Sequence, residues 1–101
     1  MAKIINLEGL DGAGKSTLLK KLKSYFNNNN IPFKSMHFPT TDKQYTYGEL
    51  VGQYLNGDFG DLDPRVASTL FAGDRLEHSK KIRDWLSEGY YVILDRYLYS
   101  N

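Results

Sequence analysis

Residues 9–16 read GLDGAGKS, which satisfies the pattern G-x-x-x-x-G-K-S/T. A mostly apolar run rich in β-branched residues, Lys3–Glu8, precedes this stretch, and apolar residues recur at helical spacing after it. A glycine-rich turn between a strand and a helix points backbone N–H groups and the positive end of the helix dipole at an anion. The stretch therefore predicts a phosphate-binding loop in an α/β fold; the alternative is a glycine turn that only caps the helix.

The loop residues are expected to bind the phosphates of a nucleoside triphosphate. Lys15 should reach the β and γ phosphates, the hydroxyl of Ser16 should bind Mg²⁺, and Thr17 should add a secondary phosphate contact. The predicted nucleotide-binding residues are consecutive: Gly9, Leu10, Asp11, Gly12, Ala13, Gly14, Lys15, Ser16 and Thr17. An acidic side chain at Asp11 is costly beside a triphosphate unless it points away, toward a sugar hydroxyl or into solvent.

Strand and helix patterns alternate along the rest of the chain. Asp63 before Pro64 is typical of a helix start, and Gly89 is typical of a helix end. The predicted elements are strand Lys3–Glu8, a helix from Lys15 or Ser16 that Asn27–Asn30 ends, strand Phe33–Phe38, loop Pro39–Thr46, helix Tyr47–Leu55, a long helix from Pro64 to about Glu88 with a bend near Gly73, and strand Tyr90–Leu94. This alternation predicts a parallel sheet with right-handed crossovers.

Length and composition limit the class of protein. A chain of 101 residues accommodates one domain, and 41% hydrophobic with 25% charged residues is typical of a globular protein. No apolar run reaches the ~20 residues of a membrane span, and no secretory signal is recognisable, so we expect a cytoplasmic protein. The absence of cysteine excludes disulfides and thiolate metal sites. A net charge of +1 disfavours binding to a nucleic-acid polymer.

Asp95, Arg96 and Tyr97 follow the last predicted strand, at the edge of the sheet where ligands of open α/β sheets bind. A carboxylate at this edge can hold the metal ion, and a guanidinium can bind a transferring phosphoryl group. We therefore assign Asp95 and Arg96, together with Lys15, as catalytic candidates. The alternative is a surface ion pair at a strand end.

Phe71 and Arg75 lie four residues apart on the long predicted helix and so share a face. An aromatic ring and a guanidinium on one face would suit a nucleoside monophosphate, through base stacking and a charge-assisted bond to phosphate. Periodicity alone favours Phe71 as a core residue and Arg75 as a solvated partner of Asp74 or Glu77. His37 and His78 have no metal-ligand spacing with another ligand, and they are expected to be structural or surface residues.

Four segments, in this order and spacing, resemble the N-terminal half of a thymidylate kinase. They are LEGLDGAGKST (residues 7–17), HFP (37–39), LFAGDRLEH (70–78) and DRYLYSN (95–101). The resemblance implies a P-loop kinase domain over residues 1–101 that transfers the γ-phosphoryl group of ATP to dTMP, with Mg²⁺, in dTTP biosynthesis. It also implies a homodimer and a sheet in which the first three strands have the spatial order 2-3-1.

The resemblance assigns roles to individual residues. Asp11 would contact the deoxyribose 3′-hydroxyl, Phe71 would stack on thymine, and Arg75 would contact the base or the phosphate of dTMP. Arg96 would bind the acceptor phosphate, Asp95 would join Ser16 at the magnesium ion, and Tyr97 would lie near the sugar. The remaining acceptor-site residues implied by the resemblance are Phe38, Pro39, Ser100 and Asn101.

The chain departs from the family pattern in two places. Many relatives carry an arginine shortly after the Phe-Pro pair, where this chain has Thr40, Thr41 and Asp42, and Lys43 is the candidate substitute. Gly12 stands where some relatives carry a P-loop arginine, so the catalytic arginine is expected in the lid. Family members are about twice as long, and we therefore expect a truncated domain without the lid and the last strands.

Two other functions remain open. A deoxynucleoside kinase would share the P-loop and the acidic-Arg pair but would accept an uncharged nucleoside, so the role of Arg75 separates the two. A noncatalytic nucleotide-binding fragment of a split or truncated kinase would bind without turnover. A GTPase is disfavoured because Asp95 begins no D-x-x-G segment and no N-K-x-D motif is present.

Overall fold

The structure is a computed structural model that describes residues 3–9 and 13–97, apart from the side chains of Ala13 and Tyr97. The elements are β1 (Ile4–Gly9), α1 (Ala13–Asn28), β2 (Phe33–Phe38), α2 (Thr46–Leu55), α3 (Pro64–Glu77), α4 (Ser79–Ser87) and β3 (Tyr91–Tyr97). They form two compact units. The first contains β1, α1, β3 and most of β2 and α4, and the second runs from Phe38 to Lys80 and contains α2 and α3.

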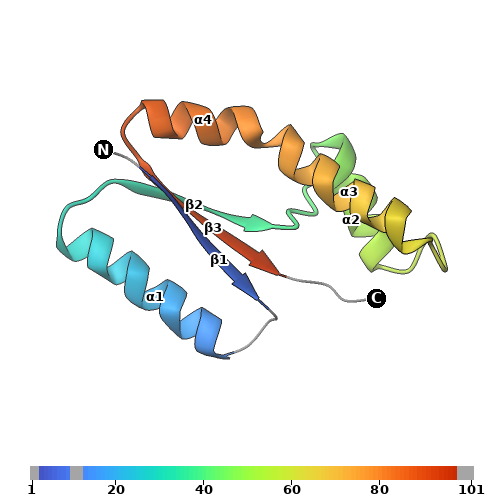
Figure 1. The fold of residues 1–101 in the computed structure, drawn as a ribbon, viewed down its shortest axis with the longest axis horizontal. Helices are drawn as coiled ribbons and strands as arrows, with labels where there is room; N and C mark the ends of the chain where they lie inside the picture. The colour runs from blue at the N-terminus through green and yellow to red at the C-terminus, as the bar shows by residue number, and fades with distance from the viewer. Residues whose placement is uncertain (1–2, 10–12, 98–101) are drawn as a thin grey trace. The chain divides into compact units, whose positions relative to one another are not determined.

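The three strands form one parallel sheet in the order β1-β3-β2 (Figure 1). β3 lies in the centre and pairs with β1 in the register Leu7 to Asp95 and Glu8 to Arg96. The α/β class and the predicted spatial order 2-3-1 are therefore confirmed. Among the described residues, no helix is both long enough and apolar enough to cross a membrane.

The core of the first unit forms around the central strand. Val92 and Ile93 in β3 are fully buried, as the absence of polar alternation in this segment predicts. Phe26 from α1 is also buried, and its ring lies 5.6 Å from that of Phe33 and 5.4 Å from that of Tyr91. These contacts hold α1 against the strands, and α1 packs on β1 (Figure 1). The start of α1 is thereby fixed next to the ends of the strands.

The ends of two elements differ from the prediction. β3 continues through Asp95 and Arg96 to Tyr97, because pairing with β1 continues as far as Gly9. The catalytic candidates therefore lie within the strand and do not follow it. α1 begins at Ala13, before Lys15, so that Lys15 lies in its first turn. Helix ends agree better: Asn30 has φ of 54° after α1 and Gly89 has φ of 95° after α4, as left-handed caps require.

The predicted long helix is two helices, and the break is at His78, not near Gly73. In a continuous α-helix each N–H bonds to the carbonyl four residues back. The N–H of His78 bonds instead to the carbonyl of Arg75, at 3.2 Å. The His78 ring places Nδ1 3.0 Å from the carbonyl oxygen of Asp74, so the side chain takes the acceptor that the backbone would have used.

In the second unit, α2 and α3 pack through small residues. Gly73 of α3 lies against the ring of Tyr47, and a Cβ atom at Gly73 would overlap that ring. Val51 of α2 and Ala67 of α3 are also buried. α3 begins as predicted, with Asp63 at the N-cap and Pro64 at the first helical position. The packing of α2 on α3 also fixes the end of the segment that connects β2 to α2.

Candidate functional site

Lys15 is the centre of the candidate site in the first unit. Its Nζ lies 3.0 Å from Oδ1 of Asp95 and donates a hydrogen bond of 3.1 Å to the carbonyl oxygen of Arg96. The side chains of Lys15 and Asp95 are only 10% and 13% exposed. The first turn of α1 contains no acidic residue that would offset the positive helix end. A mostly buried ammonium at a helix N-terminus, beside the end of β3, is suited to bind a polyphosphate.

Asp95 also faces a residue that the sequence analysis did not assign to the site. Nδ1 of His37, near the end of β2, lies 3.4 Å from Oδ2 of Asp95. His37 is expected above to be structural or a surface residue, because it has no neighbouring ligand in the sequence. The signal that identifies it is topological: parallel strands end at the same edge of the sheet, and β2 and β3 are neighbours.

Arg96 pairs with Glu8 and not with Asp95. The two residues are adjacent in β3, so their side chains point to opposite faces of the sheet. Nη1 of Arg96 lies 2.9 Å from Oε1 of Glu8, its register partner in β1, and this arginine side chain is 28% exposed. A pair this accessible contributes little to stability, and its guanidinium can exchange Glu8 for a phosphate group.

The chemistry of Asp95 and Ser16 fits a magnesium ion. Oδ1 of Asp95 is buried and has no hydrogen-bond partner, although the Lys15 ammonium lies within ion-pair distance. Mg²⁺ usually takes one or two carboxylates, a hydroxyl and substrate phosphates, not a dedicated protein cage. The described residues contain no group of three or more histidine, cysteine or acidic side chains able to hold a metal.

The acceptor-site candidates of the second unit lie on α3 and at the end of β2. Phe71 is partly buried, and its ring meets that of Tyr54 edge-on at 5.9 Å and 81°. Arg75 is exposed, while the neighbouring Asp74 and Glu77 bond to other residues, so the alternative pairing of Arg75 with them is not observed. Phe38 and Pro39 are both buried, and the peptide bond between them is cis.

The segment after Pro39 makes contacts that the sequence did not predict. Thr40 donates both its amide and its hydroxyl to the carboxylate of Asp74. Lys43, the candidate substitute for arginine, lines a polar pocket of about 530 Å³. The residues that line this pocket are Thr41, Lys43, Glu49, Gly52, Gln53, Asn56 and Asp58. Lys43 therefore lines the same pocket as the carboxylates of Glu49 and Asp58.

Several predicted site residues lie outside the described part of the chain. They are Leu10, Asp11, Gly12, Ser100 and Asn101, and the side chains of Ala13 and Tyr97. Of the remaining loop residues, Gly9 ends β1 with φ of 150°, a conformation that favours glycine. Gly14, Ser16 and Thr17 belong to the exposed first part of α1.

Comparison with known proteins gives a consistent result. The sequence model of a family described as thymidylate kinase matches residues 7–101. The chain is 37% identical to the thymidylate kinase of Plasmodium falciparum over 97% of its own length and 45% of the relative, and 40% identical to that of Mycobacterium tuberculosis over 97% and 46%. The solved structure of thymidylate kinase from Candida albicans aligns with a TM-score of 0.76 at 36% identity, over 95% of this chain and 40% of that one. The chain thus spans less than half the length of these relatives.

Proposed function

Because the chain belongs to the thymidylate kinase family, we propose that it transfers the γ-phosphoryl group of ATP to dTMP and gives ADP and dTDP. The observation that carries the proposal is the position of Lys15 in the first turn of α1, 3.0 Å from Asp95 on the central strand. A mostly buried ammonium at a helix N-terminus favours a polyphosphate as its ligand.

On the donor side, Lys15 stabilises the charge on the β and γ phosphates of ATP. Its contacts in the structure include Asp95 and the carbonyl of Arg96, and we expect ATP binding to exchange these two contacts for phosphate oxygens. Asp95 and Ser16 would hold Mg²⁺, which would supply positive charge to neutralise the phosphates.

On the acceptor side, Arg96 leaves Glu8 for the phosphate of dTMP, where its planar guanidinium can make two parallel hydrogen bonds. Phe71 stacks on the thymine ring, and Arg75 contacts the base or the phosphate. The remaining proposed acceptor residues are Asp11, Phe38, Pro39, Tyr97, Ser100 and Asn101. As in the family, the functional form is proposed to be a homodimer.

A second candidate is a noncatalytic nucleotide-binding fragment. The chain spans 45% of the Plasmodium falciparum relative and 46% of the Mycobacterium tuberculosis relative, so the activity of those whole proteins is a proposal for it. In this case the Lys15 site binds ATP, but no phosphoryl group is transferred by this chain. Binding and turnover must therefore be measured separately.

The test is ADP production from ATP and Mg²⁺ with dTMP, thymidine, dAMP and dCMP at equal concentrations. We expect the highest rate with dTMP, and we expect calorimetry to show binding of both ATP and dTMP. Highest activity with dAMP or dCMP would contradict the proposal. Equal rates with thymidine and dTMP would favour a deoxynucleoside kinase, and ATP binding without ADP production would favour the noncatalytic fragment.

A further inference from the structure

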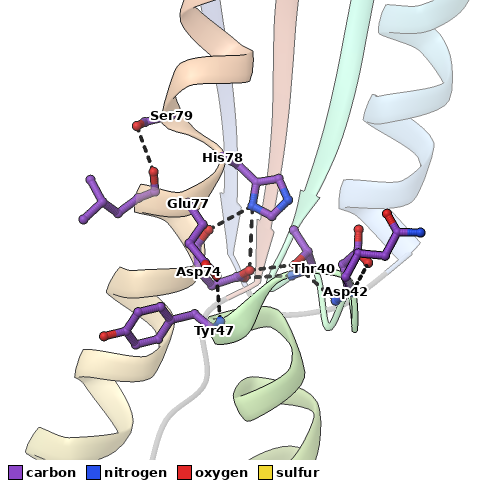
Figure 2. A network of polar contacts seen from close by, with 9 residues as sticks. Thr40, Asp42, Tyr47, Asp74, Glu77, His78 and Ser79 are labelled. Atoms are coloured by element: carbon purple, nitrogen blue, oxygen red, sulfur yellow. Dashed lines mark hydrogen bonds and ion pairs between the residues drawn. The ribbon is translucent and has the colours of Figure 1, made fainter.

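A buried carboxylate links two segments of the second unit. Asp74 in α3 is buried, and both of its carboxylate oxygens accept hydrogen bonds from Thr40 (Figure 2). The Thr40 amide donates to Oδ2 at 2.8 Å, and the Thr40 hydroxyl donates to Oδ1 at 2.6 Å. Buried charges bound in this way hold their partners in a single geometry, because losing either bond leaves part of the charge unsatisfied.

His78, which directly follows α3, contacts Phe38, the residue that precedes Pro39. His78 is 3% exposed, and its ring meets that of Phe38 edge-on at 5.8 Å and 82°. The His78 ring also lies 4.2 Å from the ring of Tyr45. Since Nδ1 of His78 contacts a carbonyl oxygen of Asp74, this nitrogen must carry the proton. The contact fixes the ring orientation against Phe38.

Glu77 completes this face of α3. Its Oε1 accepts a hydrogen bond of 2.6 Å from the amide of Tyr47, at the start of α2 (Figure 2). The segment from Phe38 to Tyr47 is therefore held at three points, by Asp74 and Glu77 of α3 and by His78 directly after it. Of these contacts, only the one between Asp74 and Thr40 includes a hydrogen bond between two side chains.

We propose that Asp74 and Thr40 form a positioning pair that sets the spacing between the Phe38–Pro39 segment and the face of α3 that carries Phe71 and Arg75. This inference rests on the proposed function, in which both segments contact the monophosphate acceptor. Thr40 directly follows Pro39, and Asp74 lies between Phe71 and Arg75, so the pair joins the two halves of the acceptor site at their nearest points in the sequence.

The proposal predicts a selective effect on the acceptor. The pair lies wholly within the second unit, whereas Lys15 and Asp95 belong to the first. Loss of the Thr40 hydroxyl should therefore weaken the binding of dTMP and leave the binding of ATP nearly unchanged. A role limited to stability would reduce the fraction of folded protein and so would affect both ligands alike.

Three variants test the pair. Thr40→Val keeps the shape of the side chain and removes the hydroxyl, Thr40→Ser retains the hydroxyl, and Thr69→Val removes a hydroxyl that bonds to the Arg65 carbonyl on the exposed side of α3. Calorimetry should give a Kd for dTMP about tenfold higher in Thr40→Val, with the Kd for ATP within about twofold of wild type. Thr40→Ser and Thr69→Val should match the wild type for both ligands.

Further measurements separate the possible failures. Hydrogen exchange at the amide of residue 40 should stay slow in Thr40→Val, because that amide still donates to Asp74. If exchange at this amide is slow and the Kd for dTMP equals that of the wild type, the positioning role is wrong. Equal weakening of dTMP and ATP would overturn it as well. If the wild type binds another nucleoside monophosphate better than dTMP, the proposed function fails, and a tenfold loss of that ligand in Thr40→Val would still support the pair.

Discussion

Replacing Gly73 by alanine should destabilise the second unit although it removes a glycine from a helix interior. Gly73 is buried in α3, and a Cβ atom there would overlap Cγ, Cδ1 and Cε1 of the Tyr47 ring. Gly52 in α2 is a matched control, because a Cβ atom at that position would lie 3.7 Å from Cβ of Thr41, an ordinary contact. Both substitutions make the same chemical change, and only one of them creates a clash.

The magnitude follows from two opposing contributions. Alanine in a helix interior is favoured over glycine by about 1 kcal/mol, whereas overpacking a filled core costs about 1–3 kcal/mol. Tyr47 cannot move away easily, because its amide is bound to Glu77 at 2.6 Å and the overlapping atoms lie near the root of its ring. We therefore expect an overpacking cost in the upper part of this range, about 2–3 kcal/mol, and so a net loss of about 1–2 kcal/mol for Gly73→Ala. Gly52→Ala, which creates no clash, should gain up to about 1 kcal/mol.

The assay is urea unfolding followed by far-UV circular dichroism, with the free energy of unfolding extrapolated to water for each variant. The double variant Gly73→Ala with Tyr47→Ala removes the clashing ring, so the two substitutions should be less damaging together than the sum of their separate effects. A Gly73→Ala protein at least as stable as Gly52→Ala would refute the packing of α3 on Tyr47.

Two further predictions concern stability. The pKa of the exposed Asp63 carboxyl is lowered below its ordinary value, mainly by the hydrogen bond from the Arg65 side chain and secondly by that from the Arg65 backbone N–H. The contribution of Asp63 to the free energy of unfolding is therefore present above the unfolded-state pKa of this carboxyl and lost as the pH falls through its folded-state pKa. The urea midpoint of the wild type should then fall toward that of Asp63→Asn on acidification, and a constant difference between the two would contradict this role. Ile93→Ala should cost about 2–5 kcal/mol, because Ile93 is fully buried in the central strand, and a loss below about 1 kcal/mol would contradict its burial.

The sequence was sufficient where local chemistry decides the structure. The Asp63-Pro64 helix start and the apolar β3 segment each depend on neighbouring residues, and both were predicted correctly. The strand order, which is also confirmed, was implied by the resemblance to a family. Contacts between distant residues were not predictable in this way. β3 extends beyond Leu94 because its partner β1 extends to Gly9, which no property of residues 95–97 indicates.

The site shows the same limit more sharply. The sequence predicted Lys15, Asp95 and Arg96 as site candidates, but it did not pair His37 with Asp95 or Glu8 with Arg96, because these partners come from neighbouring strands. The helix break at His78 arises from a side chain competing with its own backbone for the Asp74 carbonyl, and helical periodicity contains no signal for that competition. The Thr40 to Asp74 contact likewise joins residues 34 positions apart.

The central claim is that Lys15 binds the phosphates of ATP, and the most direct measurement is calorimetric titration of ATP with Mg²⁺ into wild type, Lys15→Ala and Lys20→Ala. Lys20 is the matched control, since it is an exposed lysine on the same helix. Loss of charge-assisted bonds to two phosphates should raise the Kd for ATP about a hundredfold in Lys15→Ala, while Lys20→Ala should match the wild type. Equal affinity of Lys15→Ala and wild type for ATP would contradict the account.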